Sequence, residues 1–146
     1  GPQSIIGAMK KAQSQVTSNP TSIAQYAAKA AIEGDQECVR VMTKSNKERH
    51  AYIVAELQKM PGIECKPSDG TFYTFPRVTG LFNKEFGITN DLQFAEYLLN
   101  EAEIAIVPGS AFGAEGFIRI CYTTSMENLV EAVKRLKVVT NKLAGR

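Results

Sequence analysis

One arginine in the C-terminal half of the sequence has the surroundings of an anion-binding residue. Arg119 lies in the run FIRICY, residues 117–122, where its close neighbours are apolar or small. Successive side chains of an extended strand alternate between its two faces, so Arg119 shares a face with Phe117 and Cys121. A guanidinium cannot lose its charge, and an unpaired charge in even a half-buried strand costs several kcal/mol. Arg119 therefore needs a partner.

Two kinds of partner fit this pattern. A carboxylate or phosphate ligand can be gripped by two parallel hydrogen bonds from the guanidinium. An internal Asp or Glu of the same chain fits equally well, so the pattern alone leaves a bound ligand and an internal salt bridge open.

The remaining residues with reactive side chains are few. Cys38, Cys65 and Cys121 are far apart, no CxxC motif is present, and His50 is the only histidine. This usage indicates reduced thiols that pack in the fold, and it predicts neither a disulfide nor a metal site. A catalytic pair of His50 and a cysteine stays open, although the charged helical context of His50 favours a solvated side chain.

Composition narrows the class of protein. The 146 residues are 44% hydrophobic and 22% charged, which is ordinary for a globular chain with a core. The 17 basic and 15 acidic side chains leave a net charge of +2 without a dense Lys/Arg block, so neither nucleic acid nor a membrane is the expected partner. The sequence has neither an apolar run of about 20 residues nor a signal-peptide core, and we expect a cytoplasmic protein.

The first part of the chain predicts helices. One helix covers residues 4–15 and stops at the polar run before Pro20, and a second covers residues 23–33, with Ser22 and Gln25 as a capping box and Gly34 as its end. Asp35 then caps a long helix to about Met60, whose middle, KSNKERH, is too polar to face a core.

The pattern changes after residue 62. Short β-like runs at 63–66 and 71–76, joined by the turn residues PSDG, predict a hairpin. Asn90 with Gln93 caps a further helix, residues 104–107 form a short strand, and a glycine-bearing loop at 108–116 leads to the arginine strand. Thr124 with Glu127 opens the last helix, whose apolar face is Leu129, Val133, Leu136, Val139 and Leu143. Residues 63–146 thus predict a two-layer α/β unit.

Several segments, taken in order, carry a resemblance to a known family. QSQVTSNPTSIAQ, then SDGTFYTFP, IVPGSAFG and FIRICYTTS before a capped helix resemble the C-terminal part of a class I aminotransferase, in the bacterial aspartate/prephenate branch of the fold type I pyridoxal-phosphate enzymes. The resemblance implies an α/β fold with three parts. Residues 1–34 are the incomplete end of the large, cofactor-binding domain, residues 35–62 are a linking helix, and residues 63–146 are the C-terminal small domain.

The same resemblance implies roles for particular residues. Arg119 matches the arginine that grips the α-carboxylate of the substrate. Phe72 matches an aromatic residue that lines the pocket, although a core aromatic on a strand is an equally good interpretation. Thr17, Ser18 and Asn19 match a turn that lies close to the neighbouring subunit's active site in the family's homodimer, and turn formation alone would also explain them.

One family feature has no match in this sequence. The lysine that binds the cofactor lies in a stretch like S-K-x-x-A-M-x-G-x-R-x-G, just before the position that Gly1 occupies. Lys10 and Lys11 fall after that motif and are expected to be surface lysines. We therefore predict no catalytic residue in these 146 residues, and we expect the chain to be inactive alone.

The resemblance predicts that the full-length protein is a homodimeric, pyridoxal-phosphate-dependent aminotransferase. It would transfer an amino group between an amino acid, with aspartate as the expected one, and a 2-oxo acid. Two alternatives stay open. One is a non-catalytic α/β module that binds a free amino acid through Arg119. The other is a different fold type I enzyme, either an aminotransferase for aromatic or kynurenine-like substrates or a lyase.

Overall fold

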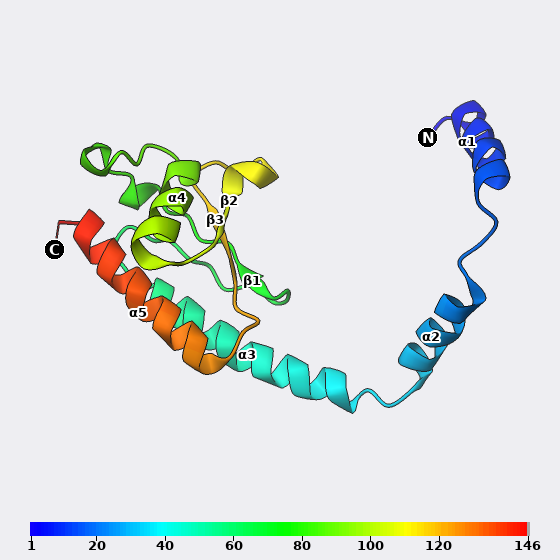
Figure 1. Cartoon of the computed structure of the whole chain (residues 1–146), viewed down its shortest axis with the longest axis horizontal. Helices are drawn as coiled ribbons and strands as arrows, with labels where there is room; N and C mark the ends of the chain where they lie inside the picture. The colour runs from blue at the N-terminus through cyan, green and yellow to red at the C-terminus, as the bar shows by residue number, and fades with distance from the viewer. Residues whose placement is uncertain (146) are drawn as a thin grey trace. The chain divides into compact units, whose positions relative to one another are not determined.

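The computed structural model describes residues 1–145 and divides the chain into two units, Gly1–Arg40 and Val41–Arg146. The first unit contains α1 (Gln3–Val16) and α2 (Ser22–Glu33), and neither helix buries a residue (Figure 1). α2 ends at Gly34 as expected. The predicted capping box is wrong, because Ser22 is already helical and the Gln25 side-chain Nε2 donates to the Pro20 carbonyl at 2.7 Å.

A long helix, α3 (Glu37–Leu57), begins in the first unit and continues into the second. The Asp35 carboxylate accepts a hydrogen bond from the Glu37 amide at 3.0 Å, as expected of a cap. Ile53, Val54 and Leu57 are the buried residues of this helix, so only its last turns contribute to a core.

The sheet of the second unit has three short antiparallel strands, β1 (Tyr73–Thr74), β2 (Val107–Pro108) and β3 (Ile118–Cys121), in the order β1-β3-β2. The arginine strand is therefore central (Figure 1). Arg119 lies opposite Val107 of β2, and Ile120 lies opposite Thr74 of β1. The strand predicted at 104–107 is shifted, because β2 begins only at Val107.

The predicted hairpin of residues 63–66 with residues 71–76 is wrong. Residues 63–66 meet the following segment only at the bridge Glu64↔Arg77. Residues 71–76 instead form backbone hydrogen bonds with β3 and the residue that follows it. The Tyr122 amide donates to the Phe72 carbonyl at 3.1 Å, and the Ile118 amide donates to the Pro76 carbonyl at 3.0 Å. Residues 71–76 thus pair with a strand more than 40 positions away, and local turn residues do not reveal such a pairing.

Two helices complete the layer behind the sheet. α4 (Asp91–Ala102) is capped as predicted, since the Asn90 side chain accepts from the Gln93 amide at 2.9 Å. α5 (Met126–Leu143) begins one residue later than expected, with Ser125 as its cap in place of Thr124. The core residues that these helices share with α3 and β3 include Ile53, Leu57, Phe94, Leu98, Ile118, Tyr122, Leu129, Val133, Leu136, Val139 and Leu143.

The two faces of β3 differ as the alternation predicts. Ile118 is 0% and Tyr122 2% exposed, so this face belongs to the core. On the other face, Phe117 and Arg119 are half-buried and Cys121 is exposed. The unit is thus a two-layer α/β fold whose open sheet face carries Arg119. In residues 1–145, no helix has the length and apolarity needed to cross a bilayer.

Candidate functional site

Arg119 is the centre of the candidate site. It lies in the middle strand, half-buried, and it makes no ion pair with any Asp or Glu among residues 1–145. The internal salt bridge that the sequence left open is therefore absent from the described chain. Other arginines of the chain do find such partners, for example Arg135 with Glu103 at 2.9 Å.

Aromatic rings surround the Arg119 guanidinium. Its Cζ lies 4.6 Å from the centroid of the Phe112 ring and 5.5 Å from that of Tyr73. Both distances are within the range of cation–π attraction. A ring face attracts the cation but accepts no strong hydrogen bond, so the guanidinium N–H groups keep their capacity to bind an anion in two parallel bonds.

These rings are part of an aromatic band on the open sheet face, consisting of Phe72, Tyr73, Phe75, Phe112 and Phe117. Phe75 stacks on Phe117 at 5.4 Å with 9° between the planes, and Phe112 meets Phe75 edge-on at 6.1 Å. Phe72 meets Tyr73 edge-on at 5.5 Å. The structure thus brings Phe72 into the same band as Arg119 through Tyr73, and at 56% exposure Phe72 is not a core residue.

The loop after β2 carries Phe112 through the short 3-10 helix η3 (Gly109–Phe112). A side chain at Gly109 would meet the carbonyl oxygen of Ala114 at 2.2 Å, so this position requires glycine. Gly116 closes the loop in the left-handed region, at φ +80°.

A buried carboxylate holds both ends of this loop. Asp91 is 2% exposed, and its oxygens accept from the Ser110 amide at 2.7 Å and the Gly116 amide at 3.4 Å. Burial pushes the pKa of Asp91 upward, but the hydrogen bonds from Ser110 and Gly116 outweigh it and leave the pKa below its ordinary value. Sequence reasoning missed this residue, because its partners lie 19 and 25 positions away.

The loop before β1 is held differently. Thr71 has φ +75°, which is strained for a β-branched residue, and its carbonyl accepts from the Tyr122 hydroxyl at 2.8 Å. The Ser68 amide donates to His50 Nε2 at 3.3 Å, and the His50 ring lies 5.5 Å from that of Tyr122. His50 is half-buried, so the expectation of a fully solvated side chain is wrong.

The cysteines do not form the alternative site considered above. The described hydrogen bonds of His50 go to Ser68 and not to a cysteine. Cys38 and Cys121 are exposed, and Cys65 is buried, which raises the pKa of its thiol. Among residues 1–145, no three His, Cys, Asp or Glu side chains are grouped as metal ligands would be.

The Thr17, Ser18 and Asn19 turn lies between α1 and α2, and all three residues are exposed. The Thr17 hydroxyl donates to the Gln13 carbonyl at 3.4 Å, so this residue ends α1. The turn belongs to the first unit and Arg119 to the second, so its role at a neighbouring subunit's site stays a prediction.

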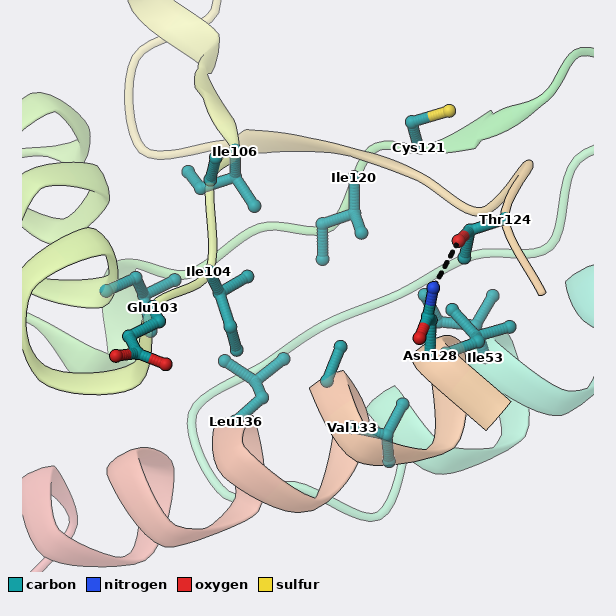
Figure 2. A pocket seen from close by; sticks show the side chains of 14 residues that line it. Ile53, Glu103, Ile104, Ile106, Ile120, Cys121, Thr124, Asn128, Val133 and Leu136 are labelled. Carbon is teal, nitrogen blue, oxygen red and sulfur yellow. Dashed lines mark hydrogen bonds between the residues drawn. The ribbon is translucent and has the colours of Figure 1, made fainter. Parts of the chain in front are cut away.

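A cavity of about 250 Å³ lies on the helical side of the sheet. Figure 2 shows Ile104, Ile106 and Ile120 facing it from the strand side, with Val133 and Leu136 on α5 below them. Its polar groups are few, including a 3.4 Å hydrogen bond from Asn128 to Thr124. Arg119 does not line this cavity, so the candidate site on the open face is separate from it.

Comparison with known families identifies the family of this chain. The family model described as aminotransferase class I and II matches residues 1–136. The chain belongs to this family. Among curated aminotransferases, it is 48% identical over 141 residues to the aspartate/prephenate aminotransferase of Nitrosomonas europaea, covering 93% of this chain and 36% of that protein. It is 40% identical over 148 residues to an aspartate aminotransferase of Rhizobium meliloti, covering 99% and 36%.

Solved aminotransferase structures share the fold. The aspartate aminotransferase from Rhizobium meliloti superposes with a TM-score of 0.81 at 39% identity, over 97% of this chain and 36% of that one. An aromatic aminotransferase from Pyrococcus horikoshii gives a TM-score of 0.79 at 35% identity, over 97% and 37%. The fold is thus that of the corresponding part of a fold type I aminotransferase. The chain spans about a third of the length of the relatives it matches.

Proposed function

We propose that this chain is the C-terminal part of a pyridoxal-phosphate-dependent aminotransferase, and that Arg119 binds the α-carboxylate of its amino-acid and 2-oxo-acid substrates. The observation that carries the proposal is a half-buried arginine on an open sheet face, without a carboxylate partner in residues 1–145 and walled by aromatic rings. A planar fork that holds a carboxylate fixes the orientation of the substrate, which brings its α-amino group and Cα–H bond into position.

The cofactor supplies an electron sink for reaction at the substrate α-carbon. The Arg119 face carries the aromatic band, Cys121, Val107 and Arg77, and none of these side chains is an amine that could hold pyridoxal phosphate covalently. We therefore assign to this chain the substrate grip and the exclusion of water by the aromatic band. We propose that the lysine that would hold the cofactor lies elsewhere in the full-length protein and that the 146-residue chain is inactive alone.

The remaining parts of the proposal follow the family. Residues 1–34 belong to the large domain, residues 35–62 link the domains, and residues 63–146 form the small domain that closes over the substrate. The full-length protein acts as a cytoplasmic homodimer, in which Thr17, Ser18 and Asn19 lie near the neighbouring subunit's site. Aspartate is the proposed amino donor, as in the names of two of the relatives.

An aromatic substrate is a second candidate, since a solved structure named as an aromatic aminotransferase matches 97% of this chain. The aromatic band beside Arg119 would suit such a side chain. Transamination rates of the full-length protein with aspartate, prephenate, phenylalanine and kynurenine as alternative reactants separate the two. A full-length protein that binds amino acids and transaminates none of them would instead support the non-catalytic module.

The decisive test is Arg119→Lys in the full-length protein. Lysine keeps the charge but loses the planar fork, so kcat/KM for the amino-acid substrate should fall roughly 30- to 1,000-fold. This corresponds to a loss of about 2 to 4 kcal/mol of transition-state stabilisation, while cofactor binding persists. The matched control is Arg77→Lys, since Arg77 forms an exposed ion pair with Glu64 at 3.7 Å. Unchanged kinetics in Arg119→Lys would refute the carboxylate role.

A further inference from the structure

Asp91 is an ionisable residue that the substrate grip does not use directly. It is 2% exposed, yet it forms no ion pair with a basic side chain among the described residues. A buried carboxylate without a cation must be satisfied by hydrogen bonds. Asp91 obtains them from the backbone amides of Ser110 and Gly116.

These two amides stand at the two ends of one loop. Ser110 is in the first turn of η3, and Gly116 lies two residues before β3 begins at Ile118. One carboxylate therefore ties the beginning of the loop to its end. The Gly116 carbonyl also accepts from the Val78 amide at 2.8 Å, which connects the same point to the chain that follows β1.

The loop between these two points presents Phe112 to Arg119. Phe112 is 50% exposed, so packing in the core does not fix its ring. The ring centroid lies 4.6 Å from the Arg119 guanidinium carbon. The ring also meets Phe75 edge-on, so its position depends on that contact and on the loop backbone. This backbone is held by the Gly109 amide, which donates to the Phe117 carbonyl at 2.7 Å, and by the Asp91 carboxylate.

Capping of α4 does not explain why Asp91 is buried with both oxygens bonded to the 109–116 loop. The cap of this helix is Asn90, whose side chain accepts from the Gln93 amide at 2.9 Å. Asp91 directs both oxygens away from α4 to the 109–116 loop. A negative charge in the first turn favours any helix, but that effect requires neither burial nor these two partners.

We propose that Asp91 is a positioning residue for the substrate-carboxylate site: by holding the amides of Ser110 and Gly116, it fixes Phe112 against the Arg119 guanidinium and pre-orients the fork. This rests on the proposed function, since it concerns the same Arg119 site. The Phe112 ring, held in this way, limits the rotamers of Arg119 before the substrate binds. Binding therefore loses less side-chain conformational entropy.

The first experiment measures kinetics of the full-length protein with Asp91→Asn. An amide presents one acceptor where the carboxylate presents two, so one of the two loop contacts is lost. KM for the amino-acid substrate should rise about tenfold, while kcat changes less than about threefold, as expected when ground-state and transition-state binding are lost together. Phe112→Leu, which leaves Asp91 in place, should raise KM by a similar factor. Because both changes act on the same ring, the double variant should raise KM by less than the product of the two single effects.

The matched control is Asn90→Ala. It weakens the same helix start but touches neither Ser110 nor Gly116, so KM should stay at the wild-type value. If Asn90→Ala raises KM as much as Asp91→Asn, the effect is one of helix stability and the positioning role is wrong. If Phe112→Leu leaves KM unchanged, the ring does not orient Arg119, and the proposal is also wrong.

A second experiment needs no enzymatic activity. In the 146-residue chain, whose second unit has its own core, NMR of the Arg119 Nε–H group should show a ring-current shift from Phe112. The shift should be lost in Phe112→Leu and Asp91→Asn, and be retained in Asn90→Ala. A shift that survives Asp91→Asn overturns the proposal. Absence of transamination by the wild-type full-length protein would overturn the proposed function instead, and the NMR result would still decide whether Asp91 positions the ring.

Discussion

Two loops border the Arg119 face, and the chain holds them by different means. The loop at 109–116 is tied by the buried carboxylate of Asp91, at 2.7 Å from the Ser110 amide. The loop at 66–72 is tied at its surface by His50, at 3.3 Å from the Ser68 amide, and by the Tyr122 hydroxyl. One loop is thus held by a buried carboxylate, and the other by a buried phenol hydroxyl and by an imidazole that lines a surface pocket.

The difference has a consequence for the proposed site. Charge-assisted hydrogen bonds are roughly twice as strong as neutral ones, and burial protects them from competing water. The wall formed by Phe112 should therefore be rigid. The wall formed by Phe72, next to the strained Thr71, should adapt more easily. A fixed grip on a carboxylate beside an adaptable wall would suit the proposed aminotransferase, whose substrates are an amino acid and a 2-oxo acid.

The largest expected effect is on the rigid side. Asp91→Ala in the 146-residue chain should lower the free energy of unfolding by about 3 kcal/mol, since it removes two charge-assisted bonds and leaves the buried Gly116 amide without its acceptor. Urea unfolding measures this change. Glu96→Ala, an exposed acid on the same helix, is the control and should stay within about 0.5 kcal/mol of wild type.

The same anchor predicts a pH dependence. The pKa of Asp91 is lower in the folded chain than its ordinary value, so its contribution to stability is complete above the unfolded-state pKa of about 4 and is lost as pH falls through the folded-state pKa. The difference in unfolding free energy between wild type and Asp91→Ala should be constant from pH 7 to about pH 5 and shrink below about pH 4. A difference that stays constant down to pH 2 would mean that the carboxylate charge contributes nothing.

The sequence predicted the parts of this fold that local rules determine. The cap at Asn90, the buried face of α5 and the alternation around Arg119 all depend on residues within one turn or strand. The errors have a shared cause. The prediction of a hairpin at 63–76 is wrong because β1 pairs with β3, more than 40 positions away. Asp91 and His50 were missed as loop anchors because their side chains bond to backbone amides of distant segments, which no local pattern records.

An intermediate effect is expected at Tyr122. Its ring is 2% exposed, and its hydroxyl donates to the Thr71 carbonyl at 2.8 Å. Tyr122→Phe keeps the ring and removes one neutral hydrogen bond, so the free energy of unfolding should fall by about 1 kcal/mol. Amide exchange should quicken at the Tyr73 N–H and stay unchanged at the Ser110 N–H. Faster exchange at both amides would show that the two loops form one cooperative unit.

The smallest effect is expected at His50. The bond to the Ser68 amide is long, Ser68 is exposed, and water can replace the imidazole as acceptor, so His50→Leu should cost about 0.5 kcal/mol or less. His50→Gln, which retains an acceptor, is the matched control and should cost still less. The comparison between the loops rests on this ordering. If His50→Leu destabilised the chain as much as Asp91→Ala, the Phe72 wall would be as firmly anchored as the Phe112 wall, and adaptability would have to come from Arg119 itself.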